Sequence, residues 1–353
     1  MTNQLSRRAL LGGSAAAAAG VLLSACGSGG SSSGGSTDKV TASEWGGVWD
    51  KALNGIAPAF KAQSGITVVN AVDDENGLVK VQQNPTLYDL AWLTADKAAQ
   101  GLAEGALQPI DTGKVTGYAD IYPNLTSSLT TGGKVAGIPV SWGVIGILYR
   151  TDLVPFEITS WKDLWRPELK GAIGIQAMPA LGAAMTLLTA AKTFGTGLND
   201  VAAGWKAMAA LKPNVQYQYS VSSDPINKLA DGSLPVAISF ADFGLPLASK
   251  KVKVVVPADG APWSPQVACI PKRAGNAAGA YKFVNYLLDP TNQVTWVKAT
   301  AVAPANSKTQ LPSDVSAKLT ETQSVADNIW KVDWLTVGKN LNSWAQQWQQ
   351  TLS

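Results

Sequence analysis

Histidine is absent from the 353 residues, and only 2 cysteines occur. Without histidine the chain cannot build a Ser-His-Asp or Cys-His nucleophile, a His-ligated zinc site or the usual acid-base group of neutral pH. Charged residues are also scarce, at 15%, with 28 basic against 25 acidic side chains. This near balance gives no electrostatic reason to bind nucleic acid. Most hydrolase templates therefore fail. A Ser-Lys or carboxylate-pair hydrolase is the enzyme alternative, but from Lys39 onward the sequence has neither a G-x-S-x-G motif nor matching carboxylates. We expect no enzyme, no metal site, no cofactor and no nucleic-acid partner.

Apolar and aromatic residues are abundant instead. The composition is 46% hydrophobic, and the 13 tryptophans are unusual for a chain of this length. A chain of 353 residues is long enough for two ordinary domains. The sequence therefore predicts a globular protein of two parts.

The N-terminus carries an export signal over residues 1–25. Arg7 and Arg8 precede a small and apolar run over 9–21, which is too short to span a membrane. Leu23-Ser24-Ala25-Cys26 resembles the bacterial lipobox, which implies cleavage before Cys26 and attachment of lipid to it. The alternative is an ordinary signal peptide in which this cysteine is incidental.

The residues around this signal agree with an anchored protein. Residues 27–37 are all Gly, Ser or Thr, so residues 26–37 are expected to be a lipidated cysteine followed by a flexible tether. Ser6-Arg7-Arg8 resembles the twin-arginine export motif. We expect an exported protein held by lipid at the outer face of the cell membrane, with the Sec and twin-arginine routes both open.

From Lys39 onward, short apolar runs alternate with helical patterns, which is typical of an α/β protein with a largely parallel sheet. Ligands of such sheets bind at the carboxyl ends of the strands. The predicted strands are 40–43, 65–69, 87–93, 144–149, 173–175, 235–240 and 252–256, and the predicted helices are 48–63, 78–83, 95–104, 183–193, 201–211 and 277–288. Four tryptophans between Trp330 and Trp348 recur at roughly helical intervals, which favours packing.

Several segments of the chain are more specific than this alternation. The most specific is Thr159–Gly171, with the sequence TSWKDLWRPELKG. Supporting segments are GITV at 65–68, YDL at 88–90, IPVSWG at 138–143, VVVP at 254–257 and AYKFVNYLLDP at 280–290. Together these segments resemble the spermidine/putrescine-type solute-binding proteins of ABC importers, and the resemblance covers about residues 39–307.

This resemblance implies a two-lobed type II periplasmic-binding fold with a ligand cleft between the lobes. We expect lobe one to comprise residues 38–142 plus 263–307, and lobe two to comprise 143–262 plus 308–353. The chain would cross between the lobes near Trp142-Gly143, near Pro262-Trp263, and between Ala305 and Pro312.

The resemblance also implies positions for the ligand contacts. Trp45, Phe240 and Trp263 stand where the family places aromatic residues against its ligand, while core or hinge packing is the alternative for each. Four further positions are at strand ends that face the cleft in the family: Trp92, Thr94, Ser141 and Trp142.

The acidic contacts of the family are where this sequence departs. Gln176 begins the segment that carries two ligand-binding acids in the family, and Gln266 lies where an Asp follows Trp263. A glutamine forms hydrogen bonds but cannot neutralise an ammonium group. Asp242 is the candidate acid that remains, with a solvated or helix-capping role as its alternative; the run Asp73-Asp74-Glu75 is more typical of a solvated helix start.

These observations predict a monomeric, lipid-anchored solute receptor that delivers a small organic solute to the permease subunits of an ABC importer. The expected solute is amine-type or polyamine-like with few positive charges. Two alternatives remain open: a secreted carbohydrate-binding or adhesion lipoprotein, and a receptor of the same class for a solute such as thiamine or an aminophosphonate.

Overall fold

The computed structural model describes residues 38–73, 77–221, 223–320 and 322–353. The predicted signal peptide, Cys26 and the tether lie outside these residues. The strands are β1 (Lys39–Glu44), β2 (Thr67–Val72), β3 (Leu90–Leu93), β4 (Thr130–Thr131), β5 (Lys134–Val135), β6 (Ile138–Arg150), β7 (Ile173–Gln176), β8 (Val215–Tyr219), β9 (Val236–Phe240), β10 (Val252–Val255), β11 (Ala261–Cys269), β12 (Ala303–Pro304) and β13 (Ile329–Trp330).

The helices follow the predicted pattern closely. They are α1 (Val48–Ser64), α2 (Gly77–Gln83), α3 (Ala95–Ala103), α4 (Pro123–Ser128), α5 (Leu181–Phe194), α6 (Val201–Leu211), α7 (Ser223–Asp231), α8 (Ala277–Leu288), α9 (Pro290–Thr300), α10 (Ser313–Ser316), α11 (Gln323–Asn328) and α12 (Trp334–Leu352). No helix of the described ranges is long and apolar enough to cross a membrane.

The α/β prediction is confirmed, but the sheet is mixed. Within the described ranges, eleven strands form one sheet whose main order is β2-β1-β3-β11-β6-β9-β7-β8. β1 runs parallel to β2 and β3, and β7 runs parallel to β8 and β9. The prediction of a largely parallel sheet is wrong at its centre, where β6 is antiparallel to β9, β10 and β11. β10 and β11 follow each other in the same direction with no helix between them. Both can therefore lie antiparallel to β6, along different parts of its length.

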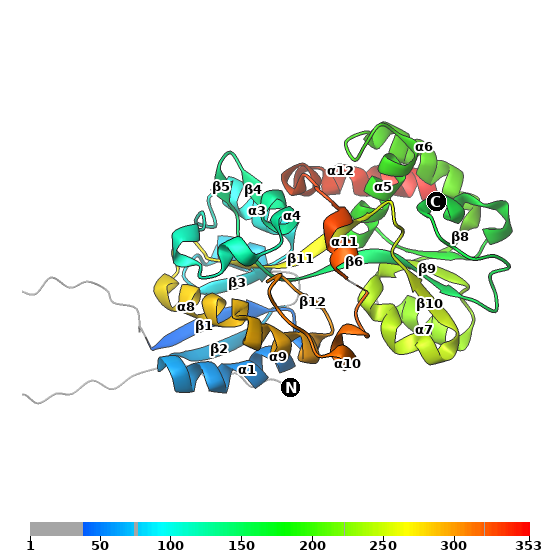
Figure 1. Cartoon of the computed structure of the whole chain (residues 1–353). Coiled ribbons are helices and arrows are strands. Elements are labelled where there is room, and N and C mark those ends of the chain that lie inside the picture. The colour runs from blue at the N-terminus through cyan, green and yellow to red at the C-terminus, as the bar shows by residue number, and fades with distance from the viewer. Residues whose placement is uncertain (1–37, 74–76, 222, 321) are drawn as a thin grey trace, which may run out of the picture. The chain divides into compact units, whose positions relative to one another are not determined.

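β6 is the longest strand and belongs to two halves of the sheet. Its residues from Ile138 to Val144 pair with β11, whereas Ile145 to Arg150 pair with β9 and β10. We call β1, β2, β3 and β11 the first half of the sheet, and β7, β8, β9 and β10 the second half. Figure 1 shows β6 running through the middle of the molecule, with β11 beside it at the border of the first half.

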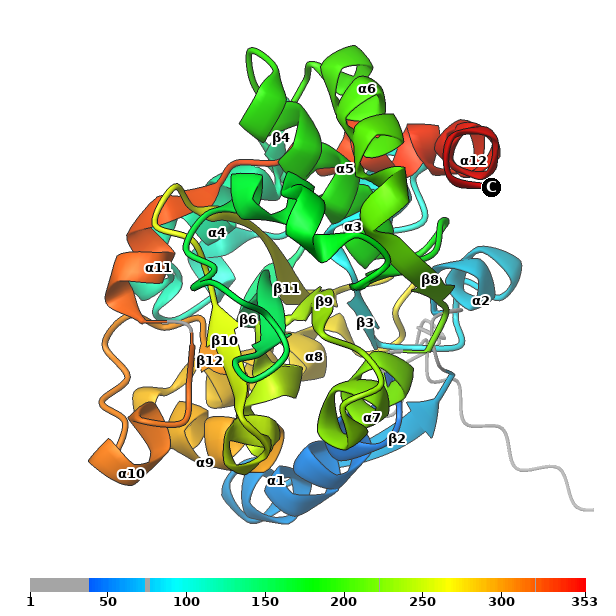
Figure 2. The ribbon, with the colours of Figure 1, turned by 90° about the vertical axis from the view of Figure 1, so that its right-hand side faces the viewer.

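Apolar periodicity explains the helices that cover the sheet. α8 occupies the predicted range and buries Ala280, Phe283, Val284 and Leu287, which recur at helical spacing. Its first turn is capped by Asn276, whose side chain accepts a hydrogen bond from the backbone N–H of Gly279 at 2.9 Å. α1 and α9 lie side by side, as do α5 and α6, in both views of the molecule (Figures 1 and 2).

The C-terminal tryptophans pack as predicted. Trp334, Trp344 and Trp348 are buried on α12, and Trp330 is buried on β13. The indole N–H of Trp348 donates to Gln218 Oε1 at 2.6 Å, and its ring meets that of Trp205 edge-on. α12 contacts α3 at one part of its length and α6 at another. Through Trp334, which meets Trp263 of β11, this helix contacts the first half of the sheet. Through Trp348 it contacts α6 and β8 on the second half.

Candidate functional site

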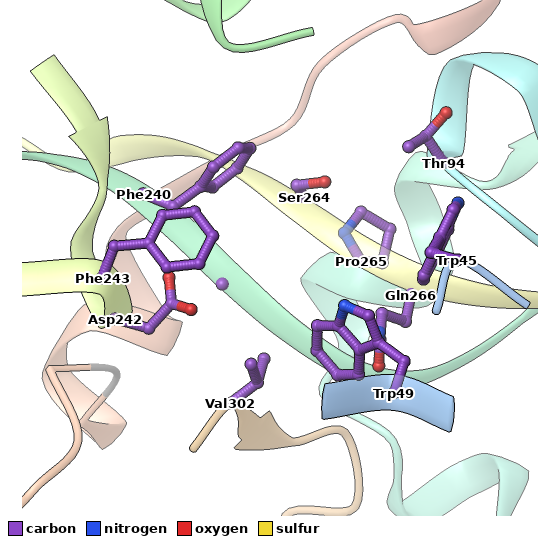
Figure 3. Close-up of a pocket in the computed structure, with 11 residues that line it drawn as sticks. Trp45, Trp49, Thr94, Phe240, Asp242, Phe243, Ser264, Pro265, Gln266 and Val302 are labelled. Atoms are coloured by element: carbon purple, nitrogen blue, oxygen red, sulfur yellow. The ribbon is translucent and has the colours of Figure 1, made fainter. Parts of the chain in front are cut away.

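A cavity of about 350 Å³ lies where the carboxyl ends of β1, β3 and β9 meet the middle of β6 and β11. This is the edge of the sheet at which the sequence predicts ligand binding. The lining consists of Trp45, Trp49, Thr94, Gly143, Phe240, Asp242, Phe243, Ser264, Pro265, Gln266 and Val302 (Figure 3). The volume falls within the range of sites for small organic molecules.

Two tryptophans form the aromatic wall on the first half of the sheet. Trp45 follows β1 directly, and Trp49 lies in the first turn of α1, with ring centroids 6.1 Å apart and planes at 69°. Trp49 stacks on Trp296 at 6.2 Å, and Trp296 stacks on Trp92 at 5.9 Å. Trp92 is only 2% exposed. The predicted contact Trp92 is therefore a support behind the wall rather than part of the lining.

The loop that carries Trp45 depends on two glycines and on Glu44. Gly46 and Gly47 have φ angles of +88° and +65°, which side chains with a Cβ adopt only with strain. Glu44 is 2% exposed, and its Oε2 accepts a hydrogen bond from the N–H of Gly46 at 2.7 Å. Burial raises the pKa of Glu44 to about 7, and the backbone hydrogen bond only partly opposes this rise. Glu44 thus shapes the loop from behind the lining.

Two phenyl rings form the opposite wall. Phe240 ends β9, and Phe243 follows in the 3₁₀ segment Ala241–Lys250, with ring centroids 6.1 Å apart and planes at 86°. Asp242 lies between them in the sequence, and its carboxylate points toward the cavity beside the Phe243 ring (Figure 3).

Asp242 is a half-buried acid without a countercharge. No Lys or Arg of the described ranges forms an ion pair with it, and no Lys or Arg lines the cavity. Loss of hydration raises its pKa to about 6, although the N–H groups of Asp242 and Phe243 favour the charged form. A carboxylate in this position gains from any cation that enters the cavity.

Gln266 supplies an oriented amide at the floor of the cavity. It lies opposite Ser141 across β11 and β6, and the Ser141 hydroxyl donates a hydrogen bond to Gln266 Oε1. Gln266 is 7% exposed and Ser141 is fully buried. Because Oε1 already accepts from the buried Ser141, the Nε2 group is the part of the amide that is left to donate to the cavity. The predicted contact Ser141 therefore acts on the cavity through Gln266.

Five of the ten predicted contacts line the cavity: Trp45, Thr94, Phe240, Asp242 and Gln266. The other five do not. Trp142 is buried, and its indole N–H donates to the carbonyl oxygen of Pro304 at 3.0 Å. Trp263 is fully buried with its ring edge-on to Trp334 at 6.3 Å. Both tryptophans fill the space around the strand pairing rather than the cavity.

Gln176 and the early acidic run also lie apart from the lining. Gln176 ends β7, and its side chain packs against Gly182 at the start of α5. Asp73 is 5% exposed and lies 3.9 Å from Lys80 Nζ, which makes it a packed structural acid. Asp74 and Glu75 lie outside the described residues. Asp242 is therefore the acid that the structure brings to the cavity.

Sequence reasoning missed several lining residues, chiefly Trp49, Phe243 and Val302. Two of them had a usable signal. Trp49 follows Trp45 by only four residues, in the first turn of the helix predicted directly after the strand end that carries Trp45. Phe243 follows Phe240 by three residues beyond a strand end. Val302 had no signal, because only the folding of α9 and β12 brings it to the cavity. No group of three or more potential metal ligands occurs in the described ranges.

The fold and the cavity define a class of protein. The mixed sheet with a ligand-sized cavity at its strand ends is that of the type II periplasmic-binding proteins. An ABC transporter structure from Clostridium perfringens matches with a TM-score of 0.80 and 26% identity over 89% of this chain and 100% of that one. The spermidine/putrescine substrate-binding protein of Streptococcus pneumoniae matches with a TM-score of 0.74 and 23% identity over 90% and 100%.

The chain belongs to the bacterial extracellular solute-binding proteins, whose family model matches residues 55–322. It is similar to the spermidine/putrescine-binding periplasmic protein of Escherichia coli K12, with 27% identity over 67% of this chain and 69% of that protein. It is also 26% identical to the putrescine-binding periplasmic protein PotF of the same strain, over 74% and 80%. The chain is a solute-binding protein of the ABC transporter type.

Proposed function

We propose that this protein is a lipid-anchored, monomeric receptor that captures a small organic amine and delivers it to the permease of an ABC importer. The observation that carries the proposal is the cavity, which has aromatic rings on both walls and, within the described part of the chain, Asp242 as its one lining carboxylate. Aromatic faces attract cations, and a carboxylate without a partner favours one. The membership of the solute-binding family supports the same reading.

The charge of the lining argues against a polyamine as the preferred solute. The relatives named above are called spermidine- or putrescine-binding proteins. Each ammonium group that leaves water costs several kcal/mol unless a carboxylate and hydrogen bonds replace the lost hydration. Among the residues that the structure describes, Asp242 is the one carboxylate in this lining, and Glu44 accepts a hydrogen bond from Gly46 behind it. We infer a solute with no more than one positive centre.

A screen by thermal shift tests the proposal. The panel contains monoamines, diamines, spermidine, betaines, an aminophosphonate, thiamine and sugars. A monocationic amine at 100 times its dissociation constant should raise the stability by about 2.7 kcal/mol. A shift produced only by sugars, or submicromolar binding of spermidine that survives Asp242→Asn, contradicts the proposed solute class.

We further propose that residues 38–142 plus 263–307 form lobe one and that 143–262 plus 308–353 form lobe two, which close on the solute. The strands that pair with β6 change between Val144 and Ile145, which supports a crossing between the lobes there. The pairing of β12 with β6 supports the third crossing, which is expected between Ala305 and Pro312. Small-angle scattering should show a smaller radius of gyration with bound solute. A larger or unchanged radius contradicts closure.

The anchor is proposed on the residues around Cys26, with export through the Sec or the twin-arginine route. Cys26→Ser should release the protein to the medium or leave the precursor uncleaved, because no thiol remains to accept the lipid. Cys269→Ser is the matched control, since Cys269 is fully buried in β11. Unchanged recovery of a normally processed Cys26→Ser protein in the membrane fraction contradicts lipidation.

A further inference from the structure

We propose that the solute carries a single cationic nitrogen at one end, held by Asp242, and an uncharged hydrogen-bond acceptor at the other, held by Gln266. This inference rests on the proposed function and specifies its solute class. The two side chains enter the cavity from opposite sides in Figure 3, with Asp242 beside Phe243, and with Gln266 below Trp45 and beside Trp49. A molecule that satisfies both must therefore extend across the cavity.

The cationic end follows from the side chains around Asp242. Phe240 and Phe243 present two rings nearly at right angles beside the carboxylate. The carboxylate has no ion pair with a described residue. A cationic nitrogen in this corner meets both a charge and ring faces, which is the combination that replaces lost hydration.

The acceptor end follows from the hydrogen bond between Ser141 and Gln266. A free glutamine amide can turn to offer either its oxygen or its NH₂ group. Here Oε1 accepts the hydrogen bond from the buried Ser141 hydroxyl, so the N–H groups are the part of the amide that is left for the cavity. An ammonium group also has only N–H donors, so a second amine would face these N–H groups and match this position less well than an oxygen acceptor. A carbonyl or amide oxygen would complete the hydrogen bond.

The net charge of the lining decides between an uncharged acceptor and a carboxylate. Asp242 contributes one negative charge, and no Lys or Arg is among the lining residues that the structure describes. A carboxylate on the solute would be desolvated without a cationic partner. The solute is therefore a monocation overall.

The cavity limits the length of this molecule. Water occupies about 30 Å³ per molecule in the liquid, so a cavity of about 350 Å³ holds on the order of ten non-hydrogen atoms. A chain of four or five methylene groups between the two polar ends fits this limit. Trp45 and Trp49 then lie beside the methylene groups.

Isothermal titration of the full-length chain with four probes of matched length tests the inference. The probes are 5-aminopentanamide, pentylamine, 5-aminopentanoate and cadaverine, which share the cation and differ at the far end. We expect 5-aminopentanamide to bind about tenfold tighter than pentylamine, and 5-aminopentanoate and cadaverine to bind at least tenfold more weakly than the amide. Tightest binding of cadaverine or of 5-aminopentanoate overturns the inference.

Two variants locate the effect at Gln266. Gln266→Leu should weaken 5-aminopentanamide about tenfold and leave pentylamine unchanged, so pentylamine binding also reports that the variant is folded. Gln266→Glu should reverse the preference toward cadaverine, because a carboxylate then faces the second ammonium. Gln216→Leu is the control, since Gln216 is exposed on β8 and bonds to the carbonyl oxygen of Ser233.

The possible failures are distinguishable. If Gln266→Leu weakens the binding of all four probes equally, or if the native protein shows no preference among them, the proposed role of Gln266 at the acceptor end is wrong. If none of the four probes binds while another solute of the wider screen does, the inference is wrong and the proposed receptor function stands. If no solute of the wider screen binds, the proposed function itself fails.

Discussion

The two walls of the cavity are built in different ways. On the first half of the sheet, Trp45 and Trp49 rest on stacked tryptophans, and Gln266 is oriented by Ser141. On the second half, Phe243 is 39% exposed, and the Asp242 carboxylate has no ion pair within the described ranges. Ring stacking and the Ser141 hydrogen bond hold the first wall in place, whereas the second wall carries a carboxylate that a cationic ligand can pair with.

The same contrast separates residues that maintain the fold from residues that bind. The family resemblance predicts both Trp45 and Trp263 as ligand contacts, but of these two only Trp45 lines the cavity. Glu44 and Asp242 are both acids with raised pKa values, but only Asp242 reaches the lining. Residue type alone therefore does not distinguish the two roles. The predictions below separate them by measurement, from the largest expected effect to the smallest.

Trp263→Ala should lower the free energy of unfolding by about 3–5 kcal/mol, because it removes a fully buried ring and leaves a cavity beside Trp334. Trp45→Ala should cost roughly 1 kcal/mol, since Trp45 is half-buried, while it weakens solute binding. Urea unfolding of both variants measures the difference. Equal losses of stability would show that Trp45 also holds the core together.

Asp242→Asn should weaken binding of a monocationic amine by roughly 10- to 100-fold, since a hydrogen bond to a charged group contributes about 1.5–3 kcal/mol. Binding of an uncharged solute of the same length should change much less. The matched control is Asp259→Asn, at an exposed acid between β10 and β11. Isothermal titration measures both, and equal losses for charged and uncharged solutes would refute the charge role of Asp242.

The pH dependence of binding sharpens the same point. The cation binds the ionised form of Asp242, whose pKa is about 6 in the free protein. Affinity for a monocationic amine should therefore be constant above that pH and fall about tenfold for each unit below it. Asp242→Asn should show a flat profile between pH 4.5 and pH 7. A steep profile in that variant would assign the titration to another group.

Glu44→Gln should have the smallest effect on the free energy of unfolding, and the sign of this effect tells whether Glu44 is needed in its charged form. The pKa of Glu44 is raised from 4.5 to about 7 in the folded protein, so the folded state holds the proton more tightly. The ionisation of Glu44 therefore lowers the free energy of unfolding as pH rises from about 4.5 to 7. The glutamine variant does not ionise and so does not show this decrease. Above pH 7 the variant should gain about 1 kcal/mol relative to the native chain, since it also loses a charged hydrogen bond from Gly46.

Chemical denaturation of both chains at pH 4.5 and pH 8 measures this difference. Glu104→Gln serves as the control, because Glu104 is exposed at the end of α3. A Glu44→Gln variant that loses stability as pH rises, relative to the native chain, would show that Glu44 is needed in its charged form.

Much of the fold was predictable because it depends on local patterns. The helix over 201–211 and the helix over 277–288 begin and end where their apolar spacing and their capping residues place them. The antiparallel centre of the sheet was not predictable from the same patterns. The apolar pattern of a strand is the same whichever way the strand runs relative to its neighbour. In addition, β6 pairs with a segment that lies more than a hundred residues away in the sequence.

The candidate site divides in the same way. The sequence by itself determined the solute-binding class, the loss of the family's acids at Gln176 and Gln266, and the candidacy of Trp45 and Asp242, because these depend on residue identity. Only the tertiary structure decided that Trp263 and Trp142 are packed away and that Trp49 and Phe243 face the cavity. The side to which a ring turns is set by the packing of distant strands and helices around it, and one chain segment does not contain that information.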